Sequence, residues 1–290
     1  LRLLGVNGFV EAFREQVSTA SSEPGMSAGP LYSVEDAMAG LVPIRVYRPT
    51  SEIAPVVCYL HGAGFIAGDL DSHDQICRLL ATQIGAVVVA VDYRLAPEHP
   101  FPAPIEDAFL AVEWILENAT QLGADRTRWA VVGDSAGGTL AAAVAQRWRD
   151  RAHSPVMQAL VCPALELADF DLPSHRAYPD GEGFTTATMR QMADLYLGDT
   201  TDRRDPLVSP TRAESLAGLP PAVIISAELD PLRDDGEMYA RRLVEAGVPV
   251  MSFRQPNMPH YGVLWCRAAP EIGPGFSVVA DALSSVLHPR

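Results

Sequence analysis

Short runs of apolar, mostly β-branched residues recur along the chain and alternate with longer stretches of mixed polarity. These runs predict buried strands at residues 56–60, 86–92, 129–132, 157–162, 222–226 and 248–253. The stretches between them are long enough for helices at residues 72–84, 104–122, 137–152 and 231–246. Strict alternation of strand and helix predicts right-handed βαβ units. We therefore expect an α/β protein with a mostly parallel central sheet flanked by helices, and residues 44–48 predict an additional edge strand.

Two segments interrupt this alternation, and we expect both to contribute to a helical cap. Residues 1–42 precede the main strands, and residues of about 168–212 replace a single crossover with a Pro-, Asp- and Gly-rich stretch that predicts a helix at 186–197. Long excursions from an α/β sheet usually form lids or binding loops. The chain is thus divided into an N-terminal cap segment, 1–42, and a main domain, 43–290, with a cap insertion at about 168–212.

Composition narrows the class of protein. The 290 residues are 48% hydrophobic, which is enough for a large core, and 22 Lys and Arg against 36 Asp and Glu give a net charge of −14. Nucleic-acid binding needs clustered Lys and Arg, so nucleic acid is excluded as a partner and an anionic membrane surface is disfavoured. The longest strongly apolar run, residues 86–91, is far shorter than the roughly 20 residues of a membrane span. We expect a soluble protein.

Cysteine usage indicates a reducing compartment. The four cysteines are far apart, with no C-x-x-C pair and no histidine at metal-ligand spacing, so neither a metal site nor a disulfide framework is predicted; they are Cys58, Cys77, Cys162 and Cys266. Charged residues between positions 2 and 15 interrupt the opening segment, so these residues do not show the continuous apolar region of a secretory signal. We expect buried free thiols and a cytoplasmic location, although a chain that begins with Leu allows for a trimmed leader.

A G-x-S-x-G pentapeptide lies directly between a predicted strand and a predicted helix. It consists of Gly133, Asp134, Ser135, Ala136 and Gly137. This context is typical of a nucleophile elbow, in which glycines allow a sharp turn that exposes the serine Oγ. The following helix N-terminus offers backbone N–H groups and a positive dipole to a developing oxyanion. Ser135 is therefore the candidate nucleophile.

A serine hydroxyl is a weak nucleophile, so it needs a base and a group that orients that base. In one arrangement of such triads the acid follows a later strand and the histidine lies near the C-terminus. Asp230 follows the predicted strand at 222–226, and His260 follows the last predicted strand. Because ligands of open α/β sheets gather at the carboxyl ends of the strands, we expect Ser135, Asp230 and His260 to converge there.

Other acids remain alternatives to Asp230. They are Glu228, Asp234 and Asp235, although the last two fall in the first turn of a predicted helix, where the helix dipole favours solvated carboxylates. The remaining histidines either precede the required strand or fall in polar stretches. His260 is thus the candidate base.

A small-residue loop after the predicted strand at 56–60 supplies the third component. Its sequence is His61, Gly62, Ala63, Gly64 and Phe65. Small residues let the backbone approach a substrate carbonyl closely, so the loop N–H groups can join that of Ala136 in binding an oxyanion.

These boxes resemble those of the hormone-sensitive-lipase-like family of α/β-hydrolase carboxylesterases, recognised by H-G-G-G and G-D-S-A-G. The likeness runs from about residue 43 to the C-terminus and includes residues 92–103 and 230–234. It implies an α/β-hydrolase fold with a cap, an ester substrate and no metal or organic cofactor. It also implies that Ala63, Gly64 and Ala136 form the oxyanion hole. His61 and Gly62 then organise the loop, and the segment at 92–103 braces it through Arg94, Glu98 and His99.

Two departures from the family pattern concern the pocket. Ala63 replaces the middle glycine of the H-G-G-G box, which keeps the N–H donor but adds a methyl group, and activity should survive unless that position needs a positive φ. Tyr261 stands where the family usually has glycine directly after the base, and Gly262 follows it. The ring is expected to narrow the pocket or tilt His260.

The leading hypothesis is hydrolysis of carboxylic esters with small to medium acyl groups, through a Ser-His-Asp triad and an acyl-enzyme. The alternative is a biosynthetic acyltransferase, lactone-forming enzyme or cyclase that uses the same triad behind a dry cap. A non-catalytic small-molecule binding protein is a third hypothesis, disfavoured because all three triad candidates are present. A homodimer formed through an edge strand or a helix would suit a symmetric association.

Overall fold

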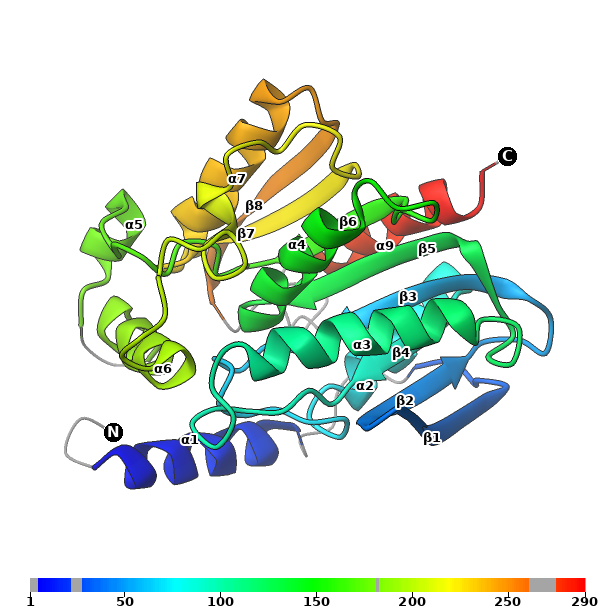
Figure 1. Ribbon diagram of the computed structural model, residues 1–290, viewed down its shortest axis with the longest axis horizontal. Coiled ribbons are helices and arrows are strands. Elements are labelled where there is room, and N and C mark those ends of the chain that lie inside the picture. The colour runs from blue at the N-terminus through cyan, green and yellow to red at the C-terminus, as the bar shows by residue number, and fades with distance from the viewer. Residues whose placement is uncertain (1–4, 22–27, 181–182, 261–274, 290) are drawn as a thin grey trace.

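The computed structural model describes residues 5–21, 28–180, 183–260 and 275–289. At its centre is an eight-stranded sheet of order β1-β2-β4-β3-β5-β6-β7-β8 (Figure 1). The strands are β1 (Ser33–Ala39), β2 (Val42–Arg48), β3 (Ala54–Leu60), β4 (Val87–Val91), β5 (Ala124–Asp134), β6 (Met157–Val161), β7 (Ala222–Leu229) and β8 (Val250–Pro259). Only the β1–β2 and β2–β4 pairs among these strands are antiparallel. The prediction of a mostly parallel sheet is confirmed.

Helices cover both faces of this sheet. One face carries α3 (Ala103–Glu117), α4 (Ala136–Trp148) and α7 (Arg233–Glu245), and the other carries α2 (Asp74–Ile84) and α9 (Gly275–Leu287) (Figure 1). The central strands β3 and β4 are buried along their whole length, as their continuous apolar sequences require between two helical layers. No helix in the described part of the chain is long and apolar enough to cross a membrane.

Two elements lie outside the expectations from sequence. The helix α9 has no counterpart among the predicted helices, and β1 falls within residues 1–42, the segment assigned to the cap. Strand β1 pairs with β2 at the end of the sheet, and its exposed Glu35 and Asp36 hide the apolar alternation that identifies a strand. Assignment of residues 33–39 to the cap is therefore wrong, because this part of the segment extends the sheet.

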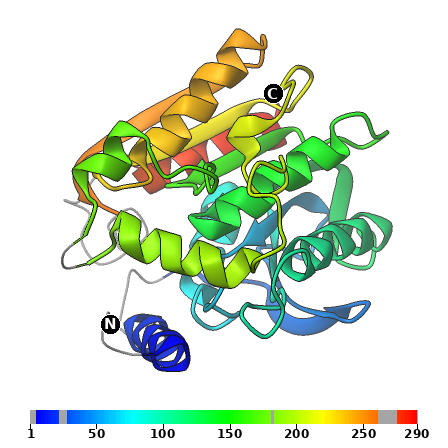
Figure 2. The same cartoon turned by 60° about the vertical axis from the view of Figure 1, so that its left-hand side comes forward.

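The remaining irregular segments form helices beyond the carboxyl ends of the strands. They are α1 (Val6–Ser21), α5 (Pro173–Ala177), α6 (Thr186–Leu197) and the short 3-10 helix η1 (Pro210–Arg212). Figures 1 and 2 both show α1 below α6 at this edge of the sheet. These positions support the proposal that both irregular segments contribute to one cap.

The segment at 92–103 is tied to α1 and α3, which supports a bracing role for Glu98 and Arg94 without direct bonds from either side chain to the loop at 61–65. Arg94 Nε and Nη2 donate to the Asp107 carboxylate of α3, both at 2.8 Å. Arg14 of α1 pairs with Glu98 at 2.7 Å and donates through Nε to the carbonyl oxygen of Ile66 at 2.8 Å. The ion pair thus holds α1 against the loop that follows His61.

A buried pair formed by a histidine and an aspartate fixes the cap insertion to α7. His175 Nε2 lies 2.7 Å from Asp235 Oδ1, and both side chains are fully buried. The second carboxylate oxygen of Asp235 accepts from the backbone N–H groups of Leu165 and Glu166, each at 3.0 Å. Burial raises the pKa of Asp235 to about 6. The expectation that Asp235 belongs to a solvated helix turn is wrong, because its carboxylate faces the cap and not water.

Asp235→Ala should lower the free energy of unfolding by about 3 kcal/mol, because it leaves His175 and two backbone N–H groups buried without their partner. Urea denaturation followed by far-UV circular dichroism measures the change. Asp150→Ala is the control and should change the free energy of unfolding by less than about 0.5 kcal/mol, since the Asp150 side chain is 89% exposed. Equal losses for the two variants would contradict the anchoring role of Asp235.

Candidate active site

Ser135 occupies a strained turn between β5 and α4. Its φ is 52° and its ψ is −117°, in a region that residues other than glycine rarely adopt. The turn is held by hydrogen bonds from the Ser135 N–H to the Val161 carbonyl oxygen at 2.8 Å and from the Ala164 N–H to the Ser135 carbonyl oxygen at 3.0 Å. This is the nucleophile-elbow geometry that the pentapeptide predicts.

The glycines of the elbow are required by close backbone contacts. A Cβ on Gly133 would overlap the backbone of Gly137, and a Cβ on Gly137 would overlap the carbonyl oxygens of Leu60 and His61. A Cβ on Gly138 would lie 2.6 Å from the Cβ of Pro163. Because α4 begins directly against the end of β3, the position of Ser135 is fixed relative to the loop at 61–65.

The structure brings Ser135, Asp230 and His260 together. His260 Nε2 lies 3.0 Å from Ser135 Oγ, and His260 Nδ1 lies 2.8 Å from Asp230 Oδ2. With the proton on Nδ1, the imidazole donates to the carboxylate and accepts from the serine hydroxyl. Asp230 is fully buried and accepts through Oδ1 from the Leu232 N–H at 2.9 Å. The arrangement can transfer the serine proton to an imidazole that the aspartate orients.

The alternative acids have other partners. Glu228 Oε2 accepts from the backbone N–H of Asn257 at 2.7 Å. Asp234 accepts from the Ser174 N–H of α5 at 2.8 Å, and Asp235 pairs with His175 as described above. Glu228 therefore braces the end of β8, which leads to His260. The sequence predicts that Tyr261 narrows the pocket or tilts His260. Tyr261 and Gly262 lie outside the described residues, as does Cys266.

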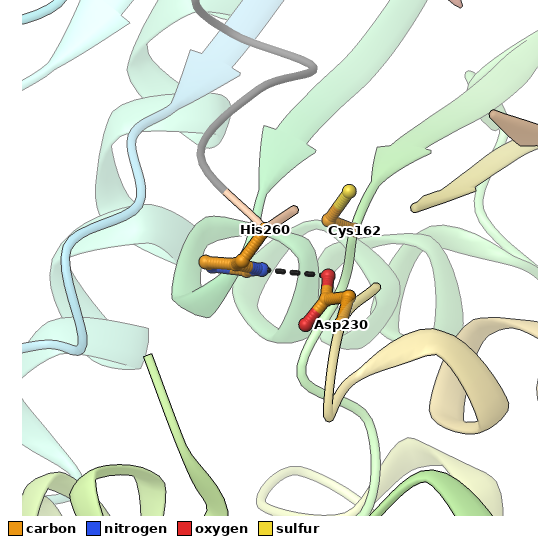
Figure 3. A group of neighbouring side chains, drawn as sticks. All are labelled: Cys162, Asp230 and His260. Atoms are coloured by element: carbon orange, nitrogen blue, oxygen red, sulfur yellow. Dashed lines mark hydrogen bonds and ion pairs between the residues drawn. The ribbon is translucent and has the colours of Figure 1, made fainter. Parts of the chain in front are cut away.

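Cys162 is a neighbour of the triad that reasoning from sequence missed. One donor atom from each of Cys162, Asp230 and His260 lies within 4.8 Å of the others (Figure 3). Burial, followed by the nearby carboxylates of Asp230 and Asp134, raises the pKa of the Cys162 thiol well above its ordinary value. A protonated thiol is a poor metal ligand. The position of Cys162 at the end of a predicted strand was the available signal, because it places the residue at the same sheet edge as Asp230.

The small-residue loop has an unusual backbone. Three successive residues have positive φ values: 74° at Ala63, 67° at Gly64 and 63° at Phe65. Ala63 therefore stands at a position of positive φ, where alanine is less favourable than the glycine of the family pattern. Gly64 and Ala136 line the same cavity as Ser135, and Ala63 immediately precedes Gly64 in the loop. The first N–H groups of α4, which include that of Ala136, have no partner within the helix.

His61 holds this loop from beneath. Its Nδ1–H donates to the Gly62 carbonyl oxygen at 2.9 Å, while the Tyr93 hydroxyl donates to the His61 carbonyl oxygen at 2.7 Å. The rings of His61 and Tyr93 stack with centroids 4.2 Å apart. Burial, with the neighbouring His73, lowers the pKa of His61 to about 4, so the imidazole is neutral near pH 7. These contacts support a role for His61 in loop organisation.

Asp134 lies between the elbow and the loop. Its Oδ1 accepts from the Tyr59 hydroxyl at 2.6 Å, and its Oδ2 lies 3.7 Å from His73 Nε2. A Cβ on Gly62 would overlap this carboxylate, so glycine is needed there. Burial alone raises the pKa of Asp134, but His73 and Tyr59 outweigh it and hold the pKa below its ordinary value. An ionised carboxylate thus packs under the loop.

The cavity in front of Ser135 is small, and its lining is mostly apolar. Its walls come from the loop at 61–65, from the segments that follow β6 and β7, and from the segment at 168–212; they are Gly64, Phe65, Ser135, Ala136, Ala164, Leu167, Phe184, Met189, Met192, Ala193 and Leu232. The segment at 168–212 thus supplies much of the surface around Ser135.

Comparison with known proteins defines the class to which this chain belongs. A family model of the α/β-hydrolase fold matches residues 57–264. Esterase LipI of Mycobacterium tuberculosis is 40% identical over 98% of this chain and 91% of its own length. The carboxylesterase NlhH of the same organism is 41% identical over 85% of this chain and 79% of its own length. The chain is a member of the α/β-hydrolase family.

Solved structures agree with this assignment. The esterase of Pyrobaculum calidifontis superimposes with a TM-score of 0.87 at 39% identity, covering 98% of this chain and 93% of that one. The carboxylesterase EstE1 from a metagenomic library superimposes with a TM-score of 0.91 at 33% identity, covering 100% of both chains. Within the α/β hydrolases, the chain belongs with the hormone-sensitive-lipase-like carboxylesterases, and the predicted resemblance is confirmed.

Ala63→Gly should raise the free energy of unfolding by about 0.5–1 kcal/mol, because glycine removes the strain of a left-handed alanine. Thermal and urea unfolding measure the change. Ala67→Gly, in the same loop but without a positive φ, is the control and should destabilise the protein. A loss of stability in Ala63→Gly as large as in Ala67→Gly would show that Ala63 is not strained.

Proposed function

We propose that this protein is a serine carboxylesterase in which Ser135, His260 and Asp230 form the catalytic triad. The observation that carries the proposal is the continuous hydrogen-bond chain from Ser135 Oγ through His260 to Asp230, at 3.0 and 2.8 Å, on the wall of an apolar cavity. Ser135 attacks the ester carbonyl while His260 Nε2 takes the hydroxyl proton. Asp230 orients the imidazole and stabilises its cation.

The proposed reaction requires only the ester and water in addition to the groups of this chain. The protonated His260 gives its proton to the departing alcohol oxygen as the carbon–oxygen bond breaks, which leaves Ser135 acylated. Water then attacks the acyl carbonyl and His260 accepts its proton. The same proton returns to Ser135 Oγ as the carboxylic acid leaves.

Backbone N–H groups of Ala63, Gly64 and Ala136 form the proposed oxyanion hole. Support comes from the position of Gly64 and Ala136 beside Ser135 in the cavity, and from the helix N-terminus at Ala136. His61 and Gly62 set the loop geometry in this proposal. They act through the hydrogen bond from His61 Nδ1 to the Gly62 carbonyl oxygen and through the close packing of Gly62 on Asp134.

The substrates we propose are esters with small to medium acyl groups. The cavity is small and has mostly apolar walls, and Met192 of α6 lies close against Gly64. An apolar wall favours an alkyl or aryl acyl chain over a charged one. The relatives named esterase and carboxylesterase support this substrate class.

Two further features of the protein are part of the proposal. Cys58, Cys77 and Cys162 are buried and form no disulfide in the described part of the chain, which supports a reducing compartment, for which we propose the cytoplasm. The strand β8 lies at one end of the sheet, and such an edge is suited to pairing with a second copy in a homodimer.

Initial rates on p-nitrophenyl esters, from acetate to long acyl chains, test the mechanism. We expect turnover that peaks at short chains and falls by a factor of about 1,000 or more in Ser135→Ala, since the nucleophile is lost. Ser51→Ala, at an exposed serine, is the control and should keep full activity. Full activity in Ser135→Ala would refute the mechanism.

Product analysis separates the other hypotheses. Ester formation from added alcohols in place of free acid would favour an acyltransferase. Stoichiometric labelling of Ser135 by a serine-directed phosphonate with negligible ester turnover would indicate another substrate or acceptor. Neither labelling nor turnover would favour a binding protein.

A further inference from the structure

An aromatic side chain from the cap packs flat on the imidazole of the triad. The rings of Phe184 and His260 have centroids 4.1 Å apart and an interplanar angle of 17°. Phe184 lies in the cap insertion, far from His260 in the sequence. The same side chain lines the cavity beside Ser135.

Two hydrogen bonds hold His260 in the plane of its ring. Nδ1 and Nε2 bond to Asp230 and Ser135. Such in-plane bonds resist displacement of the imidazole within its plane more strongly than a tilt out of it. A flat aromatic ring against one face opposes this tilt, because tilting breaks the stacked contact.

The ring also bears on the charge that forms during the reaction. In the proposed mechanism His260 becomes an imidazolium when it takes the serine proton. The face of an aromatic ring carries negative electrostatic potential, so it attracts a cation placed over it. The contact therefore becomes stronger as the transition state is approached.

The residues that directly follow Phe184 are connected to α7 by a series of hydrogen bonds. The next residue, Thr185, is the N-cap of α6 and accepts through Oγ1 from the Thr188 N–H at 3.3 Å. Thr186 Oγ1 donates to the carbonyl oxygen of His175 at 2.8 Å. His175 in turn pairs with buried Asp235. The cap anchor and the aromatic contact on His260 thus belong to one connected structure.

We propose that Phe184 is a positioning residue for the reaction: it fixes the plane of the His260 imidazole and favours its cation, so that seating of the cap and competence of the base are coupled. This inference rests on the proposed function. It differs from a role in shaping the acyl pocket alone, which would alter substrate affinity and leave the chemical step unchanged.

Kinetics of three variants test this role. Phe184→Leu keeps an apolar side chain but removes the flat ring, and should lower kcat about 3- to 10-fold on p-nitrophenyl acetate with KM within about 2-fold, as expected for an interaction gained in the transition state. Phe184→Tyr keeps the ring and should stay within about 2-fold of the parent chain. Phe109→Leu is the control, because Phe109 is an aromatic side chain of α3 that packs on Trp148 of α4, with centroids 5.9 Å apart, and not on the cap or on a histidine. It should keep kcat within about 2-fold.

A second readout does not depend on turnover. The rate of Ser135 labelling by a serine-directed phosphonate reports activation by His260, and it should fall in Phe184→Leu by the same factor as kcat. Unchanged kcat and labelling in that variant, or a change in KM alone, would overturn the proposal. An equal loss of kcat in Phe109→Leu would assign the effect to general loosening of the fold and would also overturn it. Labelling without turnover in the parent chain would refute ester hydrolysis, while the ratio of labelling rates would still decide the role of Phe184.

Discussion

The contact between the start of α4 and the end of β3 is the constraint on which the site depends. Gly137 lies so close to the carbonyl oxygens of Leu60 and His61 that no Cβ fits between them. This contact joins the serine turn and the small-residue loop into one rigid unit. Strained backbone at Ser135 costs of the order of 1–3 kcal/mol. The strain persists because β3, β4 and α4 are buried almost throughout and cannot relax without opening the core.

Regions with strong local signals were predictable from the sequence. The helix at 186–197 was predicted with its observed ends, and Thr185 and Gly198 flank it as caps. The proximity of Ser135, Asp230 and His260 followed from the rule that parallel strands deliver their carboxyl ends to one edge. In contrast, β1 was hidden by its polar edge composition, and no local pattern distinguishes an edge strand of this kind from a loop.

The remaining errors and omissions concern contacts between segments far apart in the sequence. Asp235 has the pattern of a solvated first turn, and only the arrival of His175 from the cap makes it a buried anchor. Cys162 and Phe184 approach His260 from different elements, and neither carries a motif that marks the contact. Side-chain placement of this kind depends on how the cap lies on the sheet, which periodicity does not specify.

The charges around the cavity determine how an oxyanion can be stabilised. The residues that line the cavity in the described part of the chain include no lysine or arginine, although the protein has 22 such residues in total. His61 is neutral, the Cys162 thiol is protonated, and the ionised carboxylate of Asp134 accepts a hydrogen bond from Tyr59 and lies beside His73. Among the described residues that line the cavity, backbone N–H dipoles are then the groups available to meet the negative charge, and apolar surroundings strengthen such dipoles. In the proposed oxyanion hole, two of the three N–H groups come from the loop at 61–65. The energetic consequence of alanine in place of glycine at position 63 therefore falls on the part of the site that would bind the oxyanion.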